Sequence, residues 1–429
     1  MTSALLTDRY ELTMLDAAIG SGRHERECVF ELFTRRLPEG RRYGVVAGTG
    51  RLLQLIREFR FGDAELAWLR DANVVSDKAA DWLADYRFTG TIHGYREGDL
   101  YFPGSPILVV EGTFTEAVIL ETLALSVMNY DSAVAAAAAR MVAAAEGRPL
   151  AEMGSRRTGE RSAVAAARAA FIAGFGATSN LEAGRTWGIP TMGTAAHSFT
   201  LLHDSEEEAF EAQVDALGPD TTLLVDTYDV EAAVALAVKV AGPELGAVRI
   251  DSGDLPSLVA DVRRQLDSLG ATRTRITVTN DLDEYTIAAL RGAPVDSYGV
   301  GTSVVTGSGH PACGMVYKLV AHKDDAGQWV SVAKASAAKA TIGGRKRPVR
   351  RLKAGVAVEE TIYVEEPPPA DAGRELLVEL VTDGDFNPRY LGSHGVGVAR
   401  ERHAESIAEL DPDALRLGRG DPAIATVYV

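Results

Sequence analysis

The fold is decided by four short apolar segments in the middle of the chain: TLLVD (222–226), AVRID (247–251), RITVTND (275–281) and VDSYGVGTS (295–303). Helical patterns at 229–240, 254–268 and 283–291 separate them. Asp226 and Asp251 are 25 residues apart, and Asp251 and Asp281 are 30 apart. This spacing is typical of βα units in a parallel sheet. We therefore predict an α/β core.

Each of these segments ends in polar residues, which suggests one shared functional edge. In a TIM-like barrel the active site gathers at the carboxyl ends of the strands. An open doubly wound sheet also places ligands at strand carboxyl ends, so it remains the alternative. We favour an α/β (TIM-like) barrel over residues 113–314.

The regions on both sides of this core mix helices and strands. Apolar patterning before the core predicts helices at 11–19, 45–59 and 63–69 and strands at 28–33, 90–95 and 107–111. After the core it predicts strands at 315–321, 328–333 and 356–364. We expect one α+β domain in which residues 1–112 are completed by residues 315–429. The basic run at 345–353 fits a phosphate-facing loop or a solvated strand equally well.

Composition excludes several classes of protein. The 429 residues include 44 Lys and Arg against 60 Asp and Glu, a formal net charge of −16, which disfavours nucleic-acid binding. Only Cys28 and Cys313 are present, too few for a disulfide scaffold or a multi-cysteine zinc site. We expect no signal peptide, no membrane-spanning segment and a cytoplasmic location.

The strand end at 248–254 carries the densest set of candidate site residues. Arg249 suits bidentate recognition of a carboxylate or phosphate, and Asp251 follows it on the same strand. Ser252 and Gly253 could offer backbone N–H groups to an anion at a helix start. The ordinary alternative is a structural Arg–Asp ion pair followed by a helix cap.

Three other segments add to this set. Gly301 and Thr302 follow a strand, where glycine lets the backbone approach a phosphate. His197 follows a short strand predicted at IPTMG and could act as a nucleophile or an acid/base, and Asp226 supplies a carboxylate at a neighbouring strand end that could orient it. The paired arginines at 156–157 fit an anion site or a solvated charge pair.

These residues by themselves predict an enzyme that acts on a multiply phosphorylated anionic substrate with magnesium. Tyr10 would ordinarily be read as an exposed aromatic residue next to a helix cap at Asp8. Nothing in the pattern predicts direct ligation of a metal by side chains.

A series of motifs in order along the chain resembles the nicotinate phosphoribosyltransferase family. The motifs are TDRYELTM (7–14), GSRR (154–157), GTAAHSF (193–199), LVDTYD (224–229), RIDSGDL (249–255), TNDLDE (279–284), GVGTSVVT (299–306) and VYKLV (316–320). An ordered set that runs through nearly the whole chain is far more specific than any one motif.

The resemblance implies the first step of NAD salvage from nicotinate. Nicotinate and phosphoribosyl pyrophosphate would give nicotinate mononucleotide and pyrophosphate, coupled to hydrolysis of ATP. The family fold is that of type II phosphoribosyltransferases, an irregular barrel with a domain built from both chain ends. The resemblance also implies magnesium, and a homodimer with shared active sites.

The resemblance implies roles for particular residues. His197 matches the phosphorylated histidine, Asp226 would orient its imidazole, and Arg249 matches the arginine that pairs with the nicotinate carboxylate. The other matches are Thr194 at nicotinate, Tyr10 stacking on the pyridine ring from the neighbouring subunit, Asp251 and Asp281 at ribose hydroxyls or magnesium-bound water, Gly301 and Thr302 at the 5′-phosphate, and Arg157 near the anionic substrates.

Four rival functions are considered. A nicotinamide-specific relative would bind an uncharged amide, and a quinolinate phosphoribosyltransferase would need more cations around the ring. A sugar-phosphate lyase or isomerase would need a Schiff-base lysine or paired catalytic carboxylates at strand ends, and no such lysine is present. A non-catalytic binding protein would show no turnover with any phosphoribosyl donor.

Overall fold

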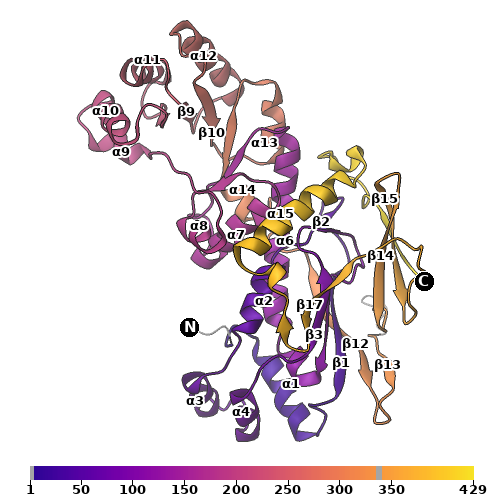
Figure 1. Ribbon diagram of the computed structural model, residues 1–429. Helices are drawn as coiled ribbons and strands as arrows, with labels where there is room; N and C mark the ends of the chain where they lie inside the picture. Colours follow the sequence, from indigo (N-terminus) through magenta and orange to yellow (C-terminus); the bar gives the residue numbers. More distant parts are fainter. Residues whose placement is uncertain (1–3, 335–340) are drawn as a thin grey trace. The chain divides into compact units, whose positions relative to one another are not determined.

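The computed structural model describes residues 4–334 and 341–429, and the chain forms two compact units (Figure 1). The first unit combines Met1–Ala136 with His310–Val429, and the second is Ala137–Gly309. The first unit therefore draws on both ends of the chain. The domain limits that we expect from the sequence, at 112 and 315, stay a prediction.

The first unit is built on a seven-stranded antiparallel sheet. Its strands, in spatial order, are β13 (Trp329–Ser331), β12 (Met315–Lys323), β1 (Glu27–Thr34), β5 (Leu108–Thr113), β3 (Thr91–Tyr95), β17 (Leu377–Thr382) and β18 (Asp385–Phe386). β1 pairs with β12 on one side and with β5 on the other. Strands from the two ends of the chain thus share one hydrogen-bonded sheet.

Two smaller sheets belong to the same unit. One has the order β16 (Arg374–Glu375), β14 (Lys346–Lys353), β15 (Val356–Val364) and β19 (Ala425–Tyr428), and the other pairs β2 (Gly44–Val45) with β4 (Leu100–Tyr101). The basic run lies on β14, so it forms a strand. It is only partly solvated, because Lys346 pairs with buried Glu31 at 2.6 Å and Arg350 with buried Glu360 at 2.6 Å.

Helices surround the large sheet and enclose an apolar core. They are α1 (Arg9–Gly20), α2 (Thr49–Arg57), α3 (Asp63–Asp71), α4 (Asp77–Ala84), α5 (Phe114–Val118), residues 121–136 of α6 (Glu121–Ala145), and α15 (Gly392–Ala408), with short 3₁₀ turns at Pro388–Tyr390 and Pro412–Leu415. Local sequence explains several of the helix boundaries. Ser76 accepts a hydrogen bond from the backbone N–H of Ala79 and so caps α4, for example.

One helical stretch among the described residues, 114–145, is long and apolar enough to cross a membrane by length and composition alone. Its most apolar window is 67% buried inside the protein. Leu123, Val127 and Met128 on α6 belong to the core of the first unit, and Asp131 pairs with Arg51 at 2.6 Å. In this structure the segment is therefore a core helix.

Helix α15 carries a buried histidine whose charge state depends on folding. His403 is buried and its backbone packs against Gly98. A Cβ added to Gly98 would lie only 2.8 Å from the His403 backbone nitrogen. Its Nδ1 lies 3.3 Å from the Gly98 carbonyl oxygen. Burial, with a smaller contribution from the positive charge of Arg400, lowers the pKa of His403 from 6.5 to about 4.

We expect acid to destabilise the first unit through His403. Between pH 6.5 and pH 4 the unfolded chain binds a proton that the folded chain excludes, so this contribution is present above pH 6.5 and is lost as the pH falls. The loss between pH 7 and pH 5 is about 2 kcal/mol. His403→Gln should lack this part of the pH dependence in chemical denaturation, whereas His394→Gln, at an exposed site on the same helix, should keep it. If the free energy of unfolding depends on pH equally in both variants, the pH dependence does not come from His403.

The second unit contains a six-stranded parallel sheet. Its spatial order is β7 (Ala177–Thr178), β6 (Leu150–Glu152), β11 (Ser297–Val300), β10 (Arg275–Val278), β9 (Ala247–Ile250) and β8 (Thr222–Leu224). The four segments that decide the fold thus become four neighbouring parallel strands, β8 to β11. The expectation of a mixed α/β fold with a parallel core is confirmed, and the sheet corresponds to half a barrel rather than a demonstrated full one.

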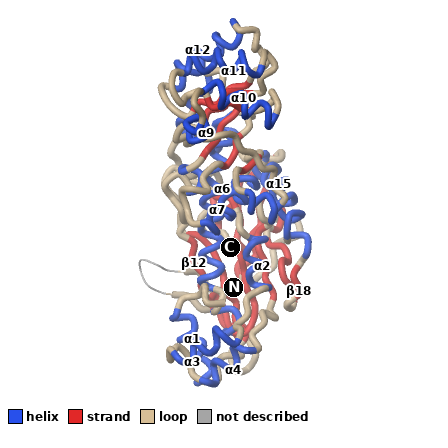
Figure 2. The backbone as a smooth tube through the Cα atoms, turned by 90° about the vertical axis from the view of Figure 1, so that its left-hand side faces the viewer, coloured by secondary structure: helices blue, strands red, loops and turns tan. Residues whose placement is uncertain are grey.

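Helices connect the parallel strands in this unit. They are α7 (Glu160–Ile172), α8 (Leu181–Trp187), α9 (His197–Leu202), α10 (Glu206–Leu217), α11 (Val230–Ala241), α12 (Leu255–Ser268), α13 (Glu284–Ala289) and α14 (Thr302–Val305), with a 3₁₀ turn at Leu290–Gly292. Figure 2 shows α10, α11 and α12 beside the strands of this unit, and neighbouring members of this trio contact each other. Asp229 caps α11 by accepting from the Ala232 backbone N–H, and Gly242 follows its last residue.

Candidate active site

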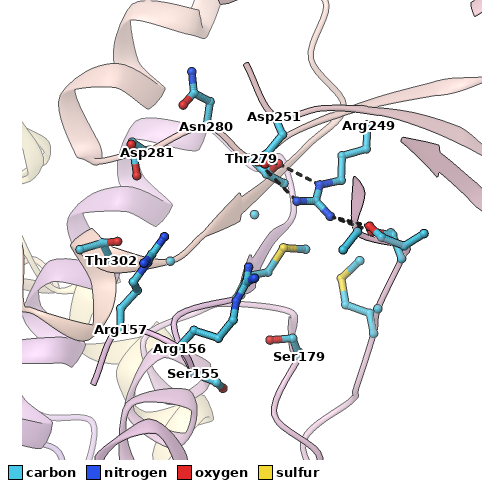
Figure 3. Close-up of a pocket in the computed structure, with 18 residues that line it drawn as sticks. Ser155, Arg156, Arg157, Ser179, Arg249, Asp251, Thr279, Asn280, Asp281 and Thr302 are labelled. Atoms are coloured by element: carbon cyan, nitrogen blue, oxygen red, sulfur yellow. Dashed lines mark hydrogen bonds and ion pairs between the residues drawn. The ribbon is translucent and has the colours of Figure 1, made fainter. Parts of the chain in front are cut away.

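A cavity of about 570 Å³ opens at the carboxyl ends of the parallel strands in the second unit (Figure 3). Three arginines and two aspartates contribute to its wall. The lining residues are Met153, Ser155, Arg156, Arg157, Ser179, Met192, Gly193, Thr194, Ala195, Ala196, Arg249, Asp251, Thr279, Asn280, Asp281, Gly299, Gly301 and Thr302. Cations outnumber anions on this wall although the whole chain has a net charge of −16.

Arg249 is held rigidly on β9 with its guanidinium in the cavity wall (Figure 3). Its Nε donates to Thr279 Oγ1 at 2.9 Å, and its Nη1 donates to Thr194 Oγ1 at 2.9 Å. Nη1 also lies 3.4 Å from the Ala195 carbonyl oxygen. A guanidinium fixed at Nε and Nη1 in this way is preorganised for a planar anionic partner.

Asp251 stands beside Arg249 at the end of the same strand. Its Oδ1 lies 3.3 Å from Arg249 Nη2 and accepts a hydrogen bond from the Thr279 hydroxyl. The side chain is 33% exposed, so the carboxylate remains accessible from the cavity. The structural ion pair considered from the sequence is therefore present, and it lies in the wall of the cavity.

His197 begins α9 and faces two carboxylates. Its Nε2 lies 3.9 Å from Asp226 Oδ1 and 4.0 Å from Asp251 Oδ2, and its Nδ1 lies 3.2 Å from Thr227 Oγ1. The side chain of His197 is 42% exposed, whereas that of Asp226 is 1% exposed. The structure thus places an accessible imidazole next to a buried carboxylate.

Only one of the two carboxylate oxygens of Asp226 accepts hydrogen bonds from the described residues. Its Oδ2 accepts from the Asp251 backbone N–H at 2.8 Å and from the Ser252 hydroxyl at 2.7 Å. Within the described chain, its buried Oδ1 has no hydrogen-bond partner. A buried carboxylate oxygen without a donor is costly, so this oxygen is suited to receive a proton-bearing group such as the nearby imidazole.

The turn after β6 carries Arg156 and Arg157 into the cavity. Figure 3 shows Arg157 directed toward Thr302 and Arg156 toward the middle of the cavity. The turn is anchored by Glu152, which accepts from the Gly154 backbone N–H and from Thr178 Oγ1. Burial raises the pKa of the Glu152 carboxyl above its usual value.

Close backbone packing shapes the floor of the cavity near Gly301 and Thr302. A Cβ on Gly154 would meet the Gly301 carbonyl oxygen at 2.8 Å and Val305 Cγ1 at 2.2 Å. A Cβ on Gly299 would meet Met153 Sδ at 2.5 Å. At Gly299 the neighbour is a flexible side chain, whereas at Gly154 it is main chain, so the backbones at Gly154 and Gly301 pack closely and form a narrow cradle.

The other predicted site residues take different places. Asp281 lines the cavity as an exposed residue with a φ of +33°. Ser252 and Gly253 do not line it; Ser252 binds Asp226, and Gly253 makes a turn with a φ of +89° before α12. Tyr10 belongs to α1 of the first unit, where its side chain is 46% exposed.

The sequence reading did not single out several lining residues. They include Met153, Ser155, Ser179, Met192, Thr279 and Asn280. Thr279 and Asn280 stand at the polar end of the segment RITVTND (275–281), so their position was a usable signal. Nothing local marks Ser179, whose place depends on the pairing of β7 with β6. In residues 4–334 and 341–429, no three His, Cys, Asp or Glu side chains gather closely enough to hold a metal ion.

Fold and site together define an enzyme site for an anionic, phosphate-bearing substrate at the end of a parallel sheet. Comparison with known proteins agrees. Residues 5–129 match the model of the nicotinate phosphoribosyltransferase (NAPRTase) N-terminal domain. The chain is 55% identical over 435 residues to nicotinate phosphoribosyltransferase pncB1 of Mycobacterium tuberculosis, covering 99% of this chain and 95% of that protein.

Two further relatives extend the comparison. Nicotinate phosphoribosyltransferase of Bacillus subtilis is 38% identical over 373 residues, covering 84% of this chain and 76% of that protein. The crystal structure of human nicotinic acid phosphoribosyltransferase superposes with a TM-score of 0.84 at 28% identity, covering 98% and 97% of the two chains. This chain belongs to the nicotinate phosphoribosyltransferase family, an enzyme family of NAD salvage.

Proposed function

We propose that this enzyme transfers the phosphoribosyl group of phosphoribosyl pyrophosphate to nicotinate, forming nicotinate mononucleotide and pyrophosphate. The observation that carries the proposal is the Arg249 guanidinium, which Thr279, Thr194 and Ala195 hold in the wall of an arginine-rich cavity. Such a group pairs with the carboxylate that distinguishes nicotinate from nicotinamide.

The remaining lining residues suit the phosphoribosyl donor. The backbone cradle at Gly301 and Thr302 would receive the 5′-phosphate, and Arg157 would face the anionic groups. Asp251 and Asp281 would face the ribose hydroxyls. As the anomeric carbon–oxygen bond breaks, positive charge develops on the ribose, and these carboxylates would stabilise it.

Magnesium fits this site as an ion held through its water ligands. The carboxylates of Asp251 and Asp281 would hold it from the cavity wall, together with oxygens of the donor. When bound, the ion would neutralise charge on the departing pyrophosphate.

We propose that ATP is a co-substrate and acts through His197. A ring nitrogen would take the γ-phosphoryl group and release ADP, and later hydrolysis would release phosphate. The accessible imidazole and the unsatisfied Asp226 Oδ1 near its Nε2 support this role, because the carboxylate favours a proton on that nitrogen and leaves the other as the nucleophile.

We also propose that the parallel sheet closes into a TIM-like barrel. The strand order runs β8, β9, β10, β11 and then returns to β6 and β7, which is the cyclic order of a barrel with a gap between β7 and β8. Thr191 forms a parallel bridge with Thr178 on the β7 side of that gap.

We propose that the enzyme acts in the cytoplasm.

The activity is tested by measuring pyrophosphate release and mononucleotide formation with nicotinate, nicotinamide and quinolinate, each with and without ATP. Nicotinate should be used best, and ATP should raise its rate. A preference for the amide or the diacid would overturn the proposal.

We propose a homodimer in which Tyr10 completes the site of the neighbouring subunit. The exposed Tyr10 ring on α1 supports this, since the cavity is lined wholly by the second unit. Tyr10→Ala and His197→Ala chains should each lack ATP-stimulated turnover, and mixing them should restore about half of the wild-type ATP-stimulated activity per mixed dimer, because one of its two sites is intact. The absence of restoration in verified mixed dimers would mean that each site is built from one chain.

A further inference from the structure

Thr279, the first residue after β10, lies between Arg249 on β9 and Asp251, the first residue after β9. Its hydroxyl oxygen accepts a hydrogen bond from Arg249 Nε at 2.9 Å and donates one to Asp251 Oδ1. The directions of these bonds are settled by chemistry, because a guanidinium only donates and a carboxylate only accepts. One hydroxyl therefore joins both groups on the cavity wall.

The position of this hydroxyl decides how Asp251 can bind the Nε and Nη2 edge of the Arg249 guanidinium. Nε and Nη2 together form one fork of an arginine, and a carboxylate that reaches both makes a bidentate pair. Asp251 Oδ1 already lies 3.3 Å from Nη2, while Thr279 Oγ1 occupies Nε. The hydroxyl thus stands where the second arm of an Arg249–Asp251 fork would form.

Packing fixes the orientation of the Thr279 side chain. Its Cγ2 methyl lies 2.7 Å from the point where a Cβ on Gly299 would be, so the methyl fills the space that glycine leaves on β11. A β-branched side chain has few χ1 states to choose from. With the methyl placed against Gly299, the hydroxyl points to Arg249 and Asp251.

We propose that Thr279 is a positioning residue that limits the ion pair between Asp251 and Arg249 to the single nitrogen Nη2 and so keeps Arg249 available to the carboxylate of nicotinate. This inference rests on the proposed function and names a determinant of its preference for acid over amide. Without the hydroxyl, Asp251 would close onto both Nε and Nη2, and the substrate carboxylate would have to displace it.

The test compares Thr279→Val and Thr279→Ala, which remove the hydroxyl, with Thr279→Ser, which keeps it. Thr277→Val is the matched control, since Thr277 lies on the same strand, binds Ser297 Oγ at 2.8 Å and does not line the cavity. Wild-type turnover with nicotinate is measured first, so that a failure of the proposed function is seen separately.

Both hydroxyl-free variants should raise the KM for nicotinate about tenfold or more and narrow the preference over nicotinamide by a similar factor. The KM for phosphoribosyl pyrophosphate should stay within about twofold, and Thr279→Ser and Thr277→Val should remain near wild type. The proposal is overturned if Thr279→Val or Thr279→Ala keeps the acid preference, if both substrates weaken equally, or if Thr279→Ser behaves like the hydroxyl-free variants. Thermal unfolding of each variant shows which of them are folded, and Thr279→Ala decides the question if Thr279→Val does not fold.

Discussion

Replacing Arg249 with glutamine is expected to weaken use of nicotinate by about 30-fold to several thousand-fold. The guanidinium offers charge-assisted hydrogen bonds to the substrate carboxylate, and losing a buried pairing of this kind costs about 2–5 kcal/mol. An amide presents one acceptor, and its NH₂ group would face a cation that cannot accept a hydrogen bond. The gap between nicotinate and nicotinamide should therefore narrow in Arg249→Gln.

The competing role for Arg249 is to hold phosphate or pyrophosphate, and kinetics separates the two. If Arg249 binds the nicotinate carboxylate, the KM for phosphoribosyl pyrophosphate should change little. Arg275→Gln is the control, because Arg275 lies on neighbouring β10, is 61% exposed and does not line the cavity. A loss of donor binding with an intact acid preference would assign Arg249 to the donor and leave Arg157 as the next candidate for the carboxylate.

His197→Ala is expected to lose the stimulation by ATP almost completely while keeping slow basal transfer. The imidazole would carry the phosphoryl group, whereas the cavity residues act on the ribose and the leaving group. The side chain is 42% exposed and makes no contribution to the core, so the variant should fold normally.

The measurement is the rate of mononucleotide formation with and without ATP, together with detection of acid-labile, base-stable phosphate on the wild-type protein. His203→Ala is the control, because His203 follows the same helix and bonds the Phe199 carbonyl oxygen at 2.8 Å. That variant should keep its response to ATP. Coupling that survives in His197→Ala, or a wild type without labelled phosphate, would rule out the phosphohistidine.

Several helices could be predicted from the periodicity of apolar residues within short segments of the sequence. The helices expected at 254–268 and 229–240 form at Leu255–Ser268 and Val230–Ala241, because their apolar faces and capping residues are encoded within each segment. The helix expected at 45–59 is shorter, at Thr49–Arg57. Gly48 immediately before it has a φ of +97°, a conformation outside the right-handed helix.

The burial of the basic run could not be read from its own residues. Lys346 pairs with Glu31, which is 315 residues away in sequence, and Arg350 pairs with Glu360 on the neighbouring strand. In the sequence, a run of cations without nearby acidic residues predicts exposed side chains, because the acidic partners that bury them lie in other segments. Only the arrangement of β14 beside β15 and near β1 shows that two of these charges are buried.

The sequence alone determined the parallel core and the edge at which its polar residues meet. Strands that are each followed by a helix run in the same direction, so their carboxyl ends gather whatever the order of the sheet. Arg249, Asp251 and Asp281 could therefore be assigned to one region before any contact was known. The same reasoning placed His197 on this rim.

The tertiary structure alone decided which of these side chains touch. β10 lies beside β9, which brings Thr279 between Arg249 and Asp251, and β8 lies on the other side of β9, which sets Asp226 under His197. Hydrogen bonds act over about 3 Å, whereas sequence spacing specifies only which strand end a residue occupies. Sheet order and side-chain packing, not the pattern along the chain, supply the remaining precision.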